Sequence, residues 1–168
     1  MRIYVPATLD ELDIVDVGRT SARWSLTPRL VHGVTKALTA ELPNEDTEGL
    51  EYSAFLDAAA ASLTLLAARR DAPPLRAVVT VEVPDTVLVP VEGQGAESAA
   101  STLRLTDVVQ DVPIVCVHAD EPEAAPDVAA LRTAADADDE DALAGAVQRA
   151  TDRDLLWYDW SEVSGIPR

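Results

Sequence analysis

Cationic side chains gather in one segment of an otherwise acidic sequence. Residues 17–40 contain no Asp or Glu, although the chain has 30 of these residues. The candidate ligand-binding residues in this segment are Arg19, Arg23, Arg29, His32, Thr35 and Lys36. If Thr35 caps a helix, the free N–H groups at that helix end would join these side chains in binding a phosphate or a carboxylate. Alternatively, the cations pair with surface carboxylates such as Glu41, Glu45 and Glu48.

A thiol and an imidazole form a second candidate site. Cys116 and His118 are two residues apart, so a strand would place both side chains on one face. With Asp120 to orient the imidazole, the three residues have the types found in a nucleophilic catalytic site. The simpler interpretation is a buried core cysteine beside a strand histidine. A metal site built from Cys116, His118 and His32 would also need a carboxylate ligand, and we expect neither a metal nor a cofactor.

Aromatic residues are concentrated near the C-terminus. Trp157, Tyr158 and Trp160 are three of the seven aromatic residues, and they lie within a predicted strand over residues 155–160. Strand alternation places Trp157 opposite the other two side chains, so one face would pack in the core and the other would offer a surface to a partner. As a sheet edge, the same strand could pair with a second copy in a homodimer.

Other motifs are incomplete. A calcium loop starting at Asp136 requires Gly at its sixth position and Glu at its twelfth, where this chain has Asp141 and Val147. The GQG at residues 93–95 lacks the spacing of a dinucleotide-binding loop, and the sequence contains neither a phosphate-binding G-x-x-x-x-G-K-[ST] nor a G-x-S-x-G nucleophile elbow. The acidic segment 136–141 is therefore predicted to be a solvated helix end or loop.

The elements that would position these residues alternate between strand and helix patterns. The capping-box spacing of Thr8 and Glu11 predicts a helix that ends at Gly18, and Thr35 predicts the start of a short helix that ends at Pro43. Residues 47–70 carry the clearest helical periodicity. Strands are predicted at 2–5, 30–34, 75–83, 86–91, 102–105, 113–118 and 155–160, loops at 19–28 and 92–101, and one or two helices at 122–150.

This order predicts one α+β domain over residues 1–168. We expect a two-layer sandwich in which helices cover one face of a mainly antiparallel sheet, with a ferredoxin-like topology as the leading arrangement. The alternating apolar pattern of the strands disfavours a parallel sheet that is buried on both faces.

Charge and composition limit the partners. The net charge of −17 repels nucleic acid and anionic membranes, so we expect neither as a partner. One cysteine cannot form an intramolecular disulfide, the first residues lack the apolar core of a signal peptide, and we identify no apolar run of membrane-spanning length. These features predict a cytoplasmic protein.

Three segments resemble a known family. They are MRIYVPATLDEL at the N-terminus, the helical LEYSAFLDAAAASLTLLA, and LLWYDWSE near the C-terminus. The chain is similar in these segments to a family of short uncharacterised proteins from high-GC actinobacteria, and the resemblance implies no activity or site residue. From the residues, we expect a nonenzymatic binding or protein-interaction module, with a protein partner or a homodimer. The alternative is a small enzyme or sensor that binds an anionic metabolite.

Overall fold

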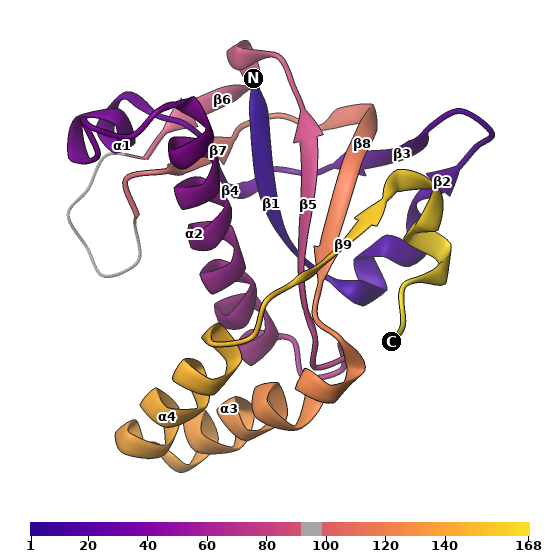
Figure 1. Ribbon diagram of the computed structural model, residues 1–168. Helices are drawn as coiled ribbons and strands as arrows, with labels where there is room; N and C mark the ends of the chain where they lie inside the picture. Colours follow the sequence, from indigo (N-terminus) through magenta and orange to yellow (C-terminus); the bar gives the residue numbers. More distant parts are fainter. Residues whose placement is uncertain (92–98) are drawn as a thin grey trace.

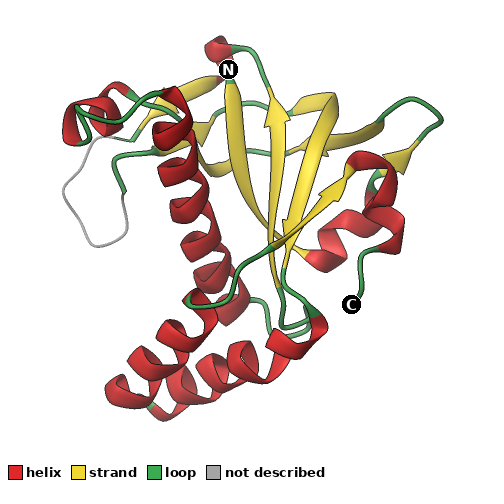
Figure 2. Ribbon diagram, viewed as in Figure 1, coloured by secondary structure: helices red, strands yellow, loops and turns green. Residues whose placement is uncertain are grey.

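The computed structural model describes residues 1–91 and 99–168, and it combines antiparallel strands with helices (Figures 1 and 2). The strands in these two ranges are β1 (Arg2–Thr8), β2 (Asp16–Val17), β3 (Ala22–Leu26), β4 (Arg29–His32), β5 (Arg76–Glu82), β6 (Leu88–Pro90), β7 (Thr102–Leu105), β8 (Val109–Ala119) and β9 (Leu156–Asp159). The α-helices are α1 (Lys36–Glu41), α2 (Thr47–Ala68), α3 (Ala125–Ala137) and α4 (Glu140–Thr151), and the 3₁₀ helices are η1 (Leu9–Ile14), η2 (Asp85–Val87), η3 (Pro122–Ala124) and η4 (Trp160–Gly165).

The strands form one strongly curved antiparallel sheet. Their order is β2-β3-β8-β5-β1-β4-β7-β6, and β9 pairs with β8 beyond the end of β3. Only residues 27–28 connect β3 to β4, yet three strands separate the two in the sheet. The sheet must therefore curl, and Figure 1 shows the segment from β3 to β4 crossing behind β8, β5 and β1.

The two faces of the sheet bury separate cores. Inside the curl, apolar side chains of β1, β5 and β8 pack against those of β3, β4 and β7; Val5, Val79, Trp24 and Leu105 are examples. On the other face, α2 covers Tyr4 and Val78. Helix α2 covers one face of the sheet and the curl of the sheet covers the other, so β5 is buried almost throughout. The alternating sequence pattern of β5 had predicted a half-buried strand.

Helix α2 is the one described helix that is long and apolar enough to span a membrane, which corrects the expectation that no apolar run reaches that length. In this fold α2 packs against the sheet through buried residues that include Leu50, Ala54 and Ala58. The buried Ser62 hydroxyl also donates to the Ala7 carbonyl and accepts from the Ala77 N–H. Helix α2 is therefore a core helix of the domain.

Local signals predicted the helix starts correctly. Thr8 and Glu11 form the predicted capping box of η1, and Thr35 accepts a hydrogen bond from the Leu38 N–H at the start of α1. The predicted helix over 47–70 is α2, and the predicted helical region 122–150 contains α3 and α4. The predicted loop 92–101 lies outside the described residues over 92–98, as does the GQG motif.

The helix predicted to end at Gly18 ends at Ile14, and Asp16–Val17 form β2 instead. Two strand predictions were also wrong. Residues 22–26 form β3 rather than a loop, because Ala22, Trp24 and Leu26 point into the core while the strand pairs with β8. Strand β1 continues through Pro6 instead of ending there. The Pro6 carbonyl accepts a hydrogen bond from Arg29, so that side of residue 6 faces away from β5 and the missing N–H costs no β1–β5 hydrogen bond.

The α+β class and the antiparallel sheet are confirmed, but the ferredoxin-like topology and the two-layer sandwich are not. Strand β1 pairs with β4 and β5, and β5, β8 and β9 follow one another as antiparallel neighbours. Helices α3 and α4 pack together beyond the end of α2, through a separate small core that includes Leu66, Val128 and Leu131.

Candidate functional site

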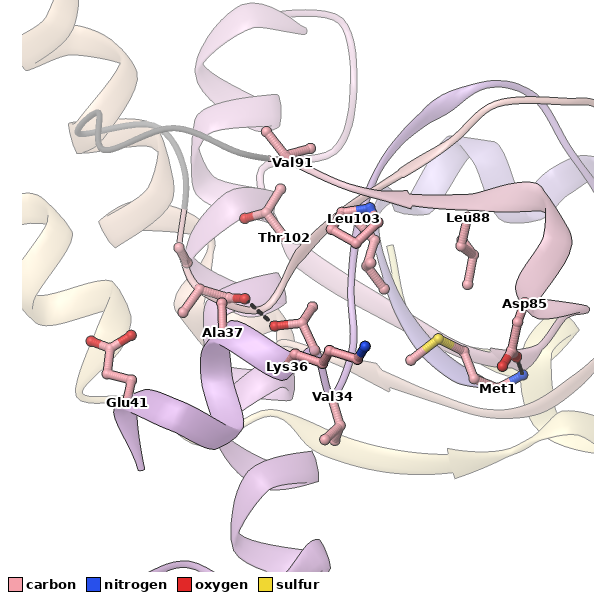
Figure 3. Close-up of a pocket in the computed structure, with 14 residues that line it drawn as sticks. Met1, Val34, Lys36, Ala37, Glu41, Asp85, Leu88, Val91, Thr102 and Leu103 are labelled. Atoms are coloured by element: carbon pink, nitrogen blue, oxygen red, sulfur yellow. Dashed lines mark hydrogen bonds and ion pairs between the residues drawn. The ribbon is translucent and has the colours of Figure 1, made fainter. Parts of the chain in front are cut away.

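A cavity of about 950 Å³ opens beside α1 (Figure 3). Its walls come from residues 34–37 at the start of α1, from β6 and β7 with their flanking residues, and from Met1 and Asp85. Most of the lining is apolar, and it includes Val34, Leu88 and Leu103. Cavities of this size and character are typical of sites for small organic ligands.

Thr35 and Gly33 fix the position of the cavity wall that is formed by the start of α1. The Thr35 hydroxyl accepts from the Leu38 N–H at 3.0 Å and donates to the Ala100 carbonyl at 2.5 Å, which joins the start of α1 to the residues before β7. A Cβ on Gly33 would lie 3.1 Å from Leu103 Cδ1 and 3.3 Å from the Arg2 carbonyl. The close approach of β4 to its neighbours therefore favours glycine at this position.

The cavity wall includes a cation, Lys36, that has no acidic partner among the described residues. Lys36 extends its amine toward Met1 in Figure 3, and no ion pair joins it to a residue in 1–91 or 99–168. By contrast, Asp85 is paired at 2.8 Å with the N-terminal ammonium group. Glu41, at the other end of α1 from Lys36, also lines the cavity without an ion pair to residues 1–91 or 99–168. The described part of the wall therefore carries one free cation, Lys36, and one free carboxylate, whereas Asp85 is neutralised.

A buried hydroxyl without a partner also lies at the cavity. Thr102 lines the cavity, and its Oγ1 is buried without a hydrogen-bond partner among the described residues. A buried hydroxyl in this state carries an unfavourable desolvation cost. Its oxygen is closed to solvent, so it is part of the wall and not a group that a ligand in the cavity contacts.

A chain of hydrogen bonds lies next to the cavity. Thr102 is directly opposite His32 on the paired strands β7 and β4. The Ser101 hydroxyl donates to Asp57 Oδ2 at 2.6 Å and lies 2.8 Å from His32 Nδ1. Because the serine hydrogen is engaged with Asp57, the histidine Nδ1–H is assigned as the donor to Ser101 Oγ.

This chain is a structural contact rather than a nucleophilic triad. In a Ser-His-Asp triad the histidine bridges the other two groups, whereas here Ser101 is the bridge and is fully buried. Burial lowers the pKa of His32, although the charge of Asp57 acts in the opposite direction. The three side chains tie β4, α2 and the start of β7 together.

The predicted cationic residues do not all come together. His32, Thr35 and Lys36 lie at or behind the cavity, on β4 and α1. Arg19 is exposed in the turn between β2 and β3, and Arg23 on β3 donates to the Asp111 carbonyl at 2.9 Å. Since β2 and β3 lie at the end of the strand order opposite to β7 and β6, these two arginines line a different part of the sheet.

Arg29 is engaged inside the fold. It pairs with Glu11 at 2.6 Å, donates to the Pro6 carbonyl, and lies over the ring of Trp24 at 5.8 Å. Burial alone would raise the pKa of Glu11, but the hydrogen bond and charge of Arg29, together with Thr8, outweigh it and hold the pKa below its ordinary value. Arg29 therefore stabilises the contact between η1 and β4.

The Cys116 and His118 side chains share a face of β8, as the strand pattern predicted. They lie opposite Thr80 and Val78 of β5. The His118 ring contacts Phe55 with centroids 4.6 Å apart, burial lowers the pKa of His118, and its Nδ1 has no partner among the described residues. Cys116 is buried.

Asp120 does not orient His118. It binds Arg76 through both carboxylate oxygens, including an Nη2–Oδ1 contact of 2.7 Å, and both side chains are almost completely buried. The three candidate catalytic residues are thus close in sequence, but the acid serves a different partner. No group of three His, Cys, Asp or Glu side chains within the described ranges is arranged to hold a metal ion.

The strand predicted over 155–160 is shorter, because β9 ends at Asp159 and Trp160 begins η4; within β9, Trp157 and Tyr158 differ in burial as the alternation predicted. Tyr158 and Trp160 pack against the core inside the curl, whereas Trp157 is 59% exposed. Strand β9 pairs with β8 alone among the described strands.

Several cavity residues were not identified from the sequence. Thr102, in the cavity wall, has no local signal. Ser101 and Asp57, which lie next to the cavity, have none either, because their hydrogen bonds join segments 44 to 69 residues apart. Met1 and Leu88 likewise reach the cavity only through the sheet order.

One of three comparisons with known proteins found a match. Comparison with curated proteins and comparison with solved structures each produced no match. The profile of a family of unknown function (DUF6912) matches residues 1–166. The match covers nearly the whole chain and carries no activity or site residue with it. The chain belongs to this uncharacterised family, DUF6912.

Proposed function

We propose that the protein is a nonenzymatic binding module whose cavity beside α1 takes a small organic acid with an apolar body. The observation that carries the proposal is a mainly apolar cavity of about 950 Å³ into which Lys36, the only lysine of the chain, extends. The apolar walls favour a hydrocarbon or ring, and the ammonium group favours a carboxylate or phosphate at one end of it.

The surroundings of Lys36 support an anionic ligand. The whole chain is strongly acidic, so a cation that has no described acidic partner provides local complementarity to an anion that the rest of the surface repels. The Lys36 ammonium group would fix the orientation of a ligand that the apolar walls bind without direction.

The reactive side chains support binding rather than catalysis. Ser101 and His32 are committed to the buried chain with Asp57, and Asp120 is committed to Arg76. A catalytic nucleophile or base needs access to the substrate, and these groups lie behind the cavity or away from it.

Calorimetric titration with octanoate and 1-octanol tests the proposal. The two probes share an apolar chain and differ in the carboxylate. The wild-type protein should bind octanoate at least about tenfold more tightly than octanol, since a charge-assisted hydrogen bond contributes about 1.5–3 kcal/mol. Lys36→Met should remove this preference while leaving octanol binding unchanged. Arg104→Met, which removes an exposed cation from β7 outside the cavity lining, is the matched control. Equal affinities for both probes in the wild-type protein would contradict the proposal.

We also propose that β9 provides a contact to a second copy of the chain. Exposed Trp157 favours this second function, because a large aromatic side chain beside an open sheet edge promotes association. Sedimentation velocity should detect a dimer that Trp157→Ser weakens and that Tyr52→Ser, on α2, does not. A monomer at all concentrations would contradict this contact.

A further inference from the structure

A second cavity lies over the first turns of α2. It has a volume of about 420 Å³ and is lined by Tyr4, Glu48, Gly49, Glu51, Tyr52 and Phe55. Aromatic rings and carboxylates therefore make up its side-chain lining. This composition differs from that of the cavity beside α1, which is mainly aliphatic and contains Lys36.

The aromatic rings form a continuous cluster. Phe55 makes an edge-to-face contact with Tyr4, with centroids 6.1 Å apart, and lies nearly parallel to Tyr52 at 6.2 Å. Tyr52 is 60% exposed, whereas Tyr4 is buried. A ligand in this cavity would meet a ring that faces solvent as well as rings that are fixed by the core.

The charges at this cavity are mainly negative. Glu48 and Glu51 line it, and Glu45 and Asp46 precede them on the same helix start. Arg2 pairs with Glu51 at 3.1 Å and so neutralises one carboxylate. Burial, followed by the charge of Glu51, raises the pKa of Tyr4 to about 12. The positive end of the α2 dipole opposes this field, but it amounts to only about half an elementary charge.

The geometry points to a binding site for an organic cation that carries a methylated ammonium group. Such a cation is attracted by the negative faces of aromatic rings and is more easily desolvated than a metal ion, while Glu48 supplies an opposite charge. Arg2 acts as an internal competitor, because it neutralises the other carboxylate of the cavity.

Choline and 3,3-dimethylbutan-1-ol test this inference in calorimetric titrations of the full chain. The two molecules have the same shape, and only choline is charged. We expect choline to bind about fivefold or more tightly, since a cation–π contact contributes about 0.5–2 kcal/mol. Tyr52→Leu and Glu48→Gln should each weaken choline binding severalfold, and Arg2→Met should strengthen it by freeing Glu51.

Two controls separate this site from the rest of the molecule. Glu123→Gln removes an exposed carboxylate on η3, and Lys36→Met changes the other cavity; neither should alter choline binding. Tyr52 and Glu48 are exposed, so their variants should fold, which thermal unfolding would verify. Equal binding of choline and its neutral analogue, or choline binding that is unchanged in Tyr52→Leu, would overturn the inference. Because octanoate binding depends on Lys36, failure here is distinguishable from failure at the first cavity.

The methylated ammonium group could be presented by a small molecule or by a peptide. A short peptide that contains trimethyllysine, flanked by alanines, provides the second arm of the titration. Tighter binding of choline would assign the site to a free metabolite, and tighter binding of the peptide would assign it to a protein ligand.

Discussion

At the scale of single residues, Arg76 and Asp120 form the most deeply buried ion pair among the described residues. Their side chains are 4% and 1% exposed, and the Arg76 guanidinium also donates to the Arg153 carbonyl. Asp120 additionally accepts from the Arg76 backbone N–H at 2.7 Å. The pair therefore connects the start of β5 to the end of β8 and to the segment after α4.

Replacement of Asp120 by Asn should strongly destabilise the protein. The substitution leaves the Arg76 charge buried without a counterion, which costs roughly 3–5 kcal/mol of unfolding free energy. Urea unfolding measures the loss. Asp13→Asn, which removes the exposed partner of Arg168, is the control and should cost far less. Adding Arg76→Met to Asp120→Asn should restore part of the stability; equal effects of Asp120→Asn and Asp13→Asn would contradict this interpretation.

His32 should make stability depend on pH. Burial lowers the pKa of His32 below the value of about 6.5 that the unfolded chain has. Below that pH the unfolded chain binds more protons than the folded one, so the free energy of unfolding falls as the pH falls, with a slope of up to about 1.4 kcal/mol per pH unit. His32→Asn, which keeps a donor for Ser101, should reduce this slope in urea unfolding between neutral and mildly acidic pH. The part that His118 contributes through its own lowered pKa should remain. An unchanged slope would show that His32 does not titrate as described.

At the scale of elements, α2 is attached to the sheet by a polar contact as well as by apolar packing. Ser62 lies between Ala7 of β1 and Ala77 of β5, and both of its hydrogen bonds are 3.2 Å long and buried. The helix register on the sheet thus depends on one hydroxyl group in an otherwise alanine-rich surface.

Replacement of Ser62 by Ala should loosen this attachment. Two buried backbone groups lose their partner, and the expected cost is about 1–3 kcal/mol of unfolding free energy. Hydrogen exchange should become faster at the Ala77 amide. Thr64→Ala changes an exposed position on α2 and serves as the control. If both variants unfold at the same urea concentration, the hydroxyl contact does not contribute.

Sequence patterns predicted elements with local signals and missed those that depend on distant pairing. The caps at Thr8 and Thr35 are set by residues three positions away, and both were predicted correctly. Strand β3 was missed although Ala22, Trp24 and Leu26 alternate, because Pro28 and the polar neighbours suggested a loop, and the strand depends on pairing with β8. Of the cavity beside α1, the sequence indicated only Thr35 and Lys36, with His32 behind it; the partners come from segments that the curled sheet brings together.

At the scale of the whole molecule, the net charge of −17 opposes the compact state through self-repulsion. Most described arginines are paired with carboxylates, yet acidic residues outnumber basic ones by more than two to one. Salt screens repulsion between charges that lie further apart than the Debye length, which is about 10 Å at 0.1 M ionic strength.

The melting temperature should therefore rise with salt. Between low and moderate NaCl concentrations at neutral pH, we expect an increase of a few degrees, measured by scanning calorimetry. The increase should shrink as the pH approaches the sequence isoelectric point of about 4.2, where the net charge vanishes. A melting temperature that falls with NaCl would indicate that the screened ion pairs outweigh the net repulsion.

The most direct test of the central claim is an amide NMR titration of the protein with octanoate. If the cavity beside α1 binds the acid, the shifts should concentrate at Lys36, Ala37, Thr102 and Leu103, and Lys36→Met should reduce them to the size that 1-octanol produces at the same concentration. Shifts that instead map to the Tyr52 cavity or to β9, or that are unchanged in Lys36→Met, would contradict the assignment of this cavity as the site for an organic acid.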